Sequence, residues 1–344
     1  MKHLKIALSV FLLIQMTALH AQSHKTALEY LNFVSDNQLK ITKSMWSYTK
    51  AMAHSKSDRT IDRRRSALIK TVDKAILKIS KAKGFGGNGF KTKVLDHLKL
   101  NRSLLKNEYA KIIDMKAVSE QSYDYMEAYF LAQELADKKM EESQMEYEID
   151  YYAFAAKNNI EIIESESDLS KKMKISNEVF KHYKEMYLIF FKVSINESHL
   201  MDAIQTNDVN AIQQNSNALN QLAKEGLEIL KPVELYKNDA SLIKITQKLF
   251  EFYIEETENE ITEITDFIIL NEDFESIKNT FDKTPQRKRT KKQVNAFNSK
   301  VKEVNKGVKN YNSINNKLNS KRSKLITGLN DTNSRFLAKH IPKE

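Results

Sequence analysis

Three side chains near the middle of the chain have the types and the spacing that suit a metal ion. Glu178, His182 and Glu185 are four and three residues apart, so a helix places them on one face. Carboxylate and imidazole ligands suit iron or zinc, and helical bundles hold such ions between their helices. Lys181 and Lys184 flank these residues, and the alternative that we favour is a solvated face of ion pairs.

A second group of residues is strongly cationic. Residues 283–324 contain fourteen Lys and Arg against Glu303 alone, whereas residues 119–168 and 249–282 are acidic. The densest part is the cluster Lys283, Arg287, Lys288, Arg289, Lys291 and Lys292. Such a patch suits an anionic partner, either an envelope component (lipopolysaccharide, an acidic glycan or a phospholipid headgroup) or a partner protein. The alternative is that the basic segment packs against the chain's own acidic helices.

Other chemistries have less support in the sequence. Proteins that bind single-stranded nucleic acid stack its bases on aromatic side chains, and the basic helix has only Phe297, Tyr311 and Phe336, all at core-facing positions. Residues 84–89 contain G-x-G-x-x-G, but no strand precedes them, so we expect a turn. No histidine stands in a nucleophile or acid–base motif. We expect no nucleic-acid partner, no cofactor and no enzymatic activity. The alternative of an enzyme that acts on envelope glycans would require an enclosed acidic cleft.

Aromatic side chains are dense between residues 123 and 154, where they alternate with carboxylates. Rings beside carboxylates are typical of sugar-binding surfaces, but most of these rings fall at core-facing positions. Tyr125, Tyr129 and Tyr152 remain as candidates for contact with a glycan.

Long helices must position all of these residues, because the chain has only seven glycines and three prolines. Apolar residues recur at three- and four-residue spacing and predict an all-α fold, an elongated bundle of about eight long helices with coiled-coil-like packing. Polar core-facing residues such as Asn315 and Arg322 are expected to fix the register of the packing. Residues 22–344 form one bundle or two sub-bundles, 22–160 and 161–344. The predicted helices cover about 27–52, 61–79, 90–114, 123–154, 168–206, 208–231, 239–281 with a break near Asn271, and 286–336.

The start of the chain predicts export. Lys2 and Lys5 precede a short apolar run at 6–14, and Ala21 is a small residue at the expected cut, which together indicate a signal peptide over residues 1–21. No later apolar run reaches membrane length, so no transmembrane span is expected after cleavage. The chain has no cysteine, and packing rather than disulfides must hold it together. We expect the protein in the periplasm or at the cell surface of a diderm bacterium.

Four stretches carry a resemblance to a known family: residues 27–57, 120–136, 154–173 and 297–325, which begin ALEYLNFVSD, EQSYDYMEAY, FAAKNNIEII and FNSKVKEVNK. Together with the leader they resemble a family of uncharacterised exported "surface proteins", first named in spirochaetes and common in Bacteroidota. The resemblance implies an envelope or surface address and a helical fold. Separately, His182-Tyr-Lys-Glu185 resembles the H-x-x-E motif of imelysin-like exported iron-uptake proteins, which carry glycine where this chain has Phe180.

The sequence therefore predicts an exported, non-catalytic envelope or surface protein with a binding or scaffolding role. Its expected interaction surface is the basic segment 283–324, whose densest part is the cationic cluster between residues 283 and 292. The alternative is an imelysin-like helical bundle that binds a metal ion through Glu178, His182 and Glu185.

Overall fold

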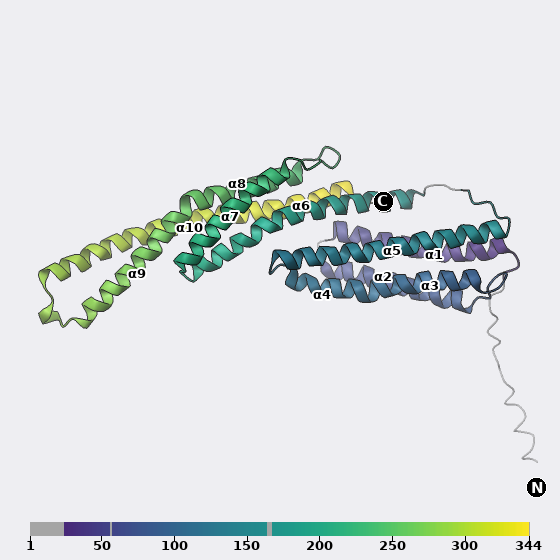
Figure 1. Ribbon diagram of the computed structural model, residues 1–344, viewed down its shortest axis with the longest axis horizontal. Helices are drawn as coiled ribbons and strands as arrows, with labels where there is room; N and C mark the ends of the chain where they lie inside the picture. Colours follow the sequence, from purple (N-terminus) through teal and green to yellow (C-terminus); the bar gives the residue numbers. More distant parts are fainter. Residues whose placement is uncertain (1–23, 56, 164–166, 344) are drawn as a thin grey trace, which may run out of the picture. The chain divides into compact units, whose positions relative to one another are not determined.

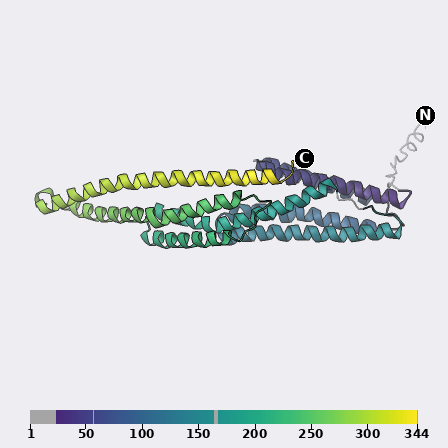
Figure 2. The ribbon, with the colours of Figure 1, turned by 90° about the horizontal axis from the view of Figure 1, so that it is seen from above.

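The computed structural model describes residues 24–55, 57–163 and 167–343, so the predicted signal peptide at 1–21 lies outside the described residues. The described chain is helical almost throughout and contains no β-strand, only an isolated bridge between Tyr236 and Asp239 (Figures 1 and 2). The all-α prediction is confirmed. Within the same residues, no helix is long and apolar enough to cross a membrane. The α-helices are α1 (Ala27–His54), α2 (Asp58–Lys81), α3 (Gly89–Ser103), α4 (Tyr109–Ser119), α5 (Tyr123–Lys157), α6 (Asp168–Gln205), α7 (Val209–Leu230), α8 (Ser241–Glu255), α9 (Ile261–Lys283) and α10 (Lys291–His340).

Two of the connections between successive helices are single π-helical turns rather than loops. Leu104–Glu108 joins α3 to α4, and Glu256–Glu260 joins α8 to α9, so the described residues form eight continuous helical rods. This agrees with the predicted number of helices. The predicted end of the third helix at 114 is too early, because α4 continues to Ser119. The break expected near Asn271 is also wrong, because α9 runs through that position.

Side-chain caps fix where several helices begin. The hydroxyl of Ser167 accepts a hydrogen bond from the backbone N–H of Ser170 and caps the start of α6. The carboxylate of Asp208 caps α7 in the same way. Thr290 and Gln293 form a reciprocal capping box at the start of α10. The capping box at Thr290 thus fixes where α10, the longest helix, begins after the short connection from α9.

By its internal contacts the described chain divides into two compact units, and the predicted sub-bundles 22–160 and 161–344 stay a prediction. Of the described residues, the first unit contains 24–45, 65–106 and 138–163. Its core includes the ring of Tyr30, which lies 6.0 Å from that of Phe154. The buried ring of His97 stacks on Tyr147 at 4.8 Å between centroids.

Of the described residues, the second unit contains 46–55, 57–64, 107–137 and 167–343. Its core lies where α6, α7, α8 and α10 meet, around the fully buried rings of Phe250 and Tyr253. Figures 1 and 2 show α9 and the first half of α10 running side by side, past the ends of α6 and α7, to a short connecting loop. We call these two helices and their connection the α9–α10 hairpin.

Close packing between α7 and α8 requires glycine at one position. A methyl group on Gly226 lies 2.6 Å from Cε2 of Phe250 and 3.2 Å from Cγ2 of Val193, and both of those side chains are buried. We expect Gly226→Ala to lower the free energy of unfolding by about 1–3 kcal/mol through overpacking. Urea unfolding followed by circular dichroism measures this change.

Gly328→Ala is the matched control, because Gly328 is also helical but the nearest atom to its added methyl group is Cδ1 of Ile245 at 3.5 Å. Alanine there removes the helix-interior penalty of glycine, and we expect a gain of up to about 1 kcal/mol. Equal effects of the two substitutions would show that the contact with Phe250 does not limit the packing of α7 on α8.

Candidate functional site

The cationic cluster predicted from the sequence lies at the end of the α9–α10 hairpin. Lys283 is the last residue of α9, Arg287 and Lys288 belong to a 3₁₀ turn in the connection, and Lys291 and Lys292 open α10. All five side chains are exposed. In the part of the chain that the structure describes, none of the five has an ion-pair partner. We call these five residues the hairpin tip.

Arg289, the sixth member of the predicted cluster, has a different environment. Its Nε donates a hydrogen bond to the carbonyl oxygen of Thr284 at 2.9 Å. Its guanidinium group lies 4.1 Å from the centre of the Phe281 ring, a cation–π contact. Arg289 is half-buried and closes the turn, so it supports the tip rather than facing a partner.

Aromatic packing between the two helices holds the tip in place. The rings of Phe281 and Phe297 stack at 4.3 Å with an angle of 8° between their planes, and Phe274 lies 5.9 Å from Phe297. Further along, Phe267 packs on Tyr311 at 4.7 Å. Offset ring pairs of this kind stabilise a two-helix contact where no third helix covers it. The five cations of the tip therefore stand on an ordered support.

Part of the remaining basic segment is paired with the protein's own carboxylates. Nζ of Lys317 lies 2.8 Å from Oε1 of Glu260, and Lys321 pairs with Glu255. Nδ2 of Asn310 donates to Glu263 at 2.7 Å. The expectation that the basic helix packs against the chain's own acidic helices is thus met along this part of α10, by residues of the acidic stretch 249–282.

Arg322 is the centre of this contact. Its Nε donates to Oε1 of Glu197 on α6, and its Nη2 donates to Oε1 of Glu256 in the π turn between α8 and α9. The side chain of Arg322 is 15% exposed, that of Glu197 is 7% exposed and that of Glu256 is fully buried. One arginine therefore ties α10 to two other helices inside the core of the second unit.

Carboxylates outnumber the guanidinium group at this point. Burial raises the pKa of Glu256 to about 7, the positive charge of Arg322 opposes the shift, and the nearby charge of Glu197 adds to it. The Oε2 atoms of Glu256 and Glu260 are buried without a hydrogen-bond partner. A carboxyl group in such a position holds a proton more readily than one in water.

The three residues of the predicted metal site lie on α6, and the structure separates their environments. The ring of His182 packs against Tyr236 at 6.0 Å and Phe336 at 5.7 Å, and burial lowers its pKa. Glu178 and Glu185 are exposed. In the described residues no group of three or more His, Asp or Glu side chains is arranged to hold a metal ion. The metal site stays a prediction, without support from this arrangement.

The predicted glycan contacts do not share one environment either. Tyr125 and Tyr152 are exposed, whereas Tyr129 is half-buried and packs on Phe130 at 5.2 Å. Burial raises the pKa of Tyr129, which leaves it a neutral ring in a packed surface. These residues give no single surface for a sugar.

One polar group was not singled out from the sequence. Asp239, just before α8, accepts hydrogen bonds from Nζ of Lys339 at 2.7 Å and Nε2 of His340 at 2.8 Å. Burial alone raises the pKa of Asp239, but the hydrogen bonds from Lys339, the backbone N–H of Ser241 and His340 hold it well below its usual range. The partners are about one hundred residues apart in sequence, so no local spacing reveals them.

Comparison with known proteins gives no relative: no protein-family model, curated protein or solved structure matches this chain. The resemblance to exported surface proteins therefore stays a prediction. The function has to be inferred from the arrangement of the chain's own residues.

The raised pKa of Glu256 predicts a pH-dependent stability. Because the folded-state pKa of about 7 lies above the ordinary value of 4.5, the folded protein holds a proton that the unfolded chain releases between these pH values. This contribution to the free energy of unfolding is complete below pH 4.5 and is lost as the pH rises to about 7. We expect the stability of the protein relative to Glu256→Gln to increase by about 2 kcal/mol from pH 7.5 to pH 5, as measured by urea unfolding.

The control for this experiment is Glu255→Gln, which removes the neighbouring, half-exposed carboxylate. For that variant we expect no comparable change in relative stability over the same pH range. Parallel stability curves for Glu256→Gln and the unmodified protein would contradict the prediction.

Proposed function

We propose that the protein is an exported, non-catalytic binding protein of the cell envelope or surface, and that the hairpin tip contacts an anionic envelope component. The observation that carries this proposal is the set of five exposed cations that have no ion-pair partner among the described residues and lie together at the end of an ordered hairpin. The basic helix behind them is paired in part with the chain's own carboxylates. Export is supported by the signal-peptide pattern at 1–21.

The position of two of these cations disfavours folding. Lys291 and Lys292 occupy the first turn of α10, and that turn contains no acidic residue. The helix dipole is positive at this end, so each lysine there costs about 0.3–1 kcal/mol. The same positive potential attracts an anion, because the N–H groups of the first turn and the lysine side chains act together. This local conflict with stability is typical of a residue kept for binding.

The number of charges sets the expected strength of the contact. Each Lys or Arg near an anionic membrane surface contributes about 1 kcal/mol, so five contribute about 5 kcal/mol. This corresponds to a dissociation constant of hundreds of micromolar for one hairpin. Exposed charges are screened by salt over about 10 Å at 0.1 M, so the contact is expected to weaken steeply as salt is added.

The direct test of the proposal is a variant, called the tip variant, in which four of the five tip charges are removed. We expect the variant to bind vesicles of phosphatidylglycerol and phosphatidylethanolamine at least tenfold more weakly than the unmodified protein at 50 mM NaCl, because most of the attraction is lost. Co-sedimentation measures the bound fraction, and lipopolysaccharide micelles provide a second anionic probe. The tip variant carries Arg287→Gln, Lys288→Gln, Lys291→Gln and Lys292→Gln.

The control removes the same charge from exposed lysines of α10 outside the tip: Lys302→Gln, Lys306→Gln, Lys309→Gln and Lys324→Gln. We expect this variant to keep most of the binding, because only the tip presents its charges together at a helix start. Equal loss in both variants would mean that net charge, and not the tip, causes the binding. No binding to either probe would refute an anionic lipid or lipopolysaccharide partner.

A further inference from the structure

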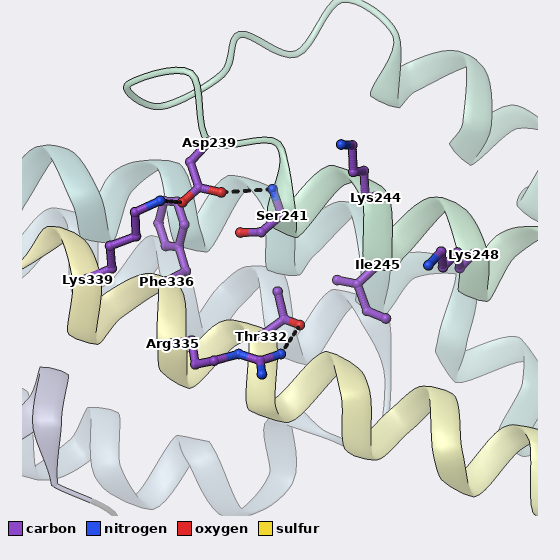
Figure 3. A pocket seen from close by; sticks show the side chains of 9 residues that line it. All are labelled: Asp239, Ser241, Lys244, Ile245, Lys248, Thr332, Arg335, Phe336 and Lys339. Atoms are coloured by element: carbon purple, nitrogen blue, oxygen red, sulfur yellow. Dashed lines mark hydrogen bonds and ion pairs between the residues drawn. The ribbon is translucent and has the colours of Figure 1, made fainter.

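The second unit contains another concentration of positive charge, around a pocket of about 420 Å³ between the start of α8 and the last turns of α10 (Figure 3). Lys244 and Lys248 come from α8, and Arg335 and Lys339 come from α10. Each pair is four residues apart, so each lies on one face of its helix. The pocket thus has two cations on either side.

Three of these four cations have no carboxylate partner in the described part of the chain. Lys339 is held by Asp239, which also lines the pocket. Arg335 donates only to a neutral group, Oγ1 of Thr332, at 3.3 Å, and no ion pair involves Lys244 or Lys248. The residues that line the pocket therefore carry a net charge of +3.

The remaining lining supplies hydrogen-bond donors and an apolar wall. Ser241 contributes a hydroxyl group and Ile245 contributes apolar surface, whereas Thr332 and Phe336 are buried. Ser241 is also the first residue of α8, and its backbone N–H already donates a hydrogen bond to Oδ1 of Asp239 at 2.9 Å. Figure 3 shows α8 and α10 on opposite sides of these side chains.

We propose that this pocket binds a phosphorylated or sulfated small molecule of about the size of a monosaccharide. A group with two negative charges matches the unpaired cations, and the planar guanidinium of Arg335 is suited to two parallel hydrogen bonds with its oxygens. The volume is within the range of small-ligand sites and exceeds what a bare phosphate ion fills. Ile245 is placed to contact the uncharged part of the ligand.

This site is separate from the hairpin tip. Arg335 and Lys291 are on the same helix, and the rise of an α-helix places them roughly 65 Å apart. The pocket therefore does not depend on the proposed contact with the envelope. The tip variant, which lacks four cations, is expected to bind the small ligand as the unmodified protein does.

Isothermal titration calorimetry with glucose 6-phosphate, inorganic phosphate and glucose tests the proposal. We expect glucose 6-phosphate to bind more tightly than phosphate and glucose not to bind. The double variant Lys248→Gln/Arg335→Gln is expected to weaken the binding of glucose 6-phosphate at least tenfold. Both side chains are exposed, and an unchanged thermal transition will show that the variant folds.

The matched control is Lys302→Gln/Lys306→Gln, which removes two exposed charges from α10 outside the pocket. Full binding in this control and loss in the pocket variant support the site. No binding of glucose 6-phosphate or phosphate, or equal loss in both variants, would overturn it. Phosphate bound as tightly as glucose 6-phosphate would overturn the assignment of a monosaccharide-sized ligand.

Discussion

The packing of the second unit depends on the buried charge of Arg322. A guanidinium group taken out of water needs partners, and Glu197 and Glu256 supply them from two different helices. Each carboxylate in turn is held in the core only because the arginine is there. The loss of Arg322 leaves two buried carboxyl groups without their positive partner, which costs about 3–5 kcal/mol. The positions of α6, α8 and α10 are therefore coupled through one side chain.

The π turn after α8 belongs to the same arrangement. The extra residue of a π turn rotates the following part of the helix about its axis. Such turns inside long helices often occur where particular side-chain contacts require this change in direction. Here the turn begins at Glu256, the carboxylate that meets Arg322, and ends at Glu260, which meets Lys317. Both ends of the irregular turn thus face the basic helix. α9 then continues to the hairpin tip along the direction that this turn sets.

The helices themselves were predictable, because a chain with few glycines and prolines and a regular apolar spacing forms long helices. The sequence also placed Arg322 at a core-facing position. It did not reveal its partners, because Glu197 and Glu256 are 125 and 66 residues away and no local period links such distant positions. The same limit applies to His182. Its spacing from Glu178 and Glu185 is helical, but the aromatic rings that cover it come from Tyr236 and Phe336. Charge counts found the basic segment, yet only the structure distinguishes the paired residues of α10 from the exposed residues of the tip.

The length of α10 has a mechanical consequence. This helix of 50 residues runs from the tip of the hairpin to the far end of the second unit, and α9 returns beside it into the same core. A force that pulls on the tip along the hairpin axis is shared by both arms and loads the contacts of α10 in shear. The ion pairs of Arg322, Lys317 and Lys321 and the aromatic stacks must then yield together rather than one after another. An antiparallel hairpin held in this way resists tension along its axis far better than forces that peel its two arms apart.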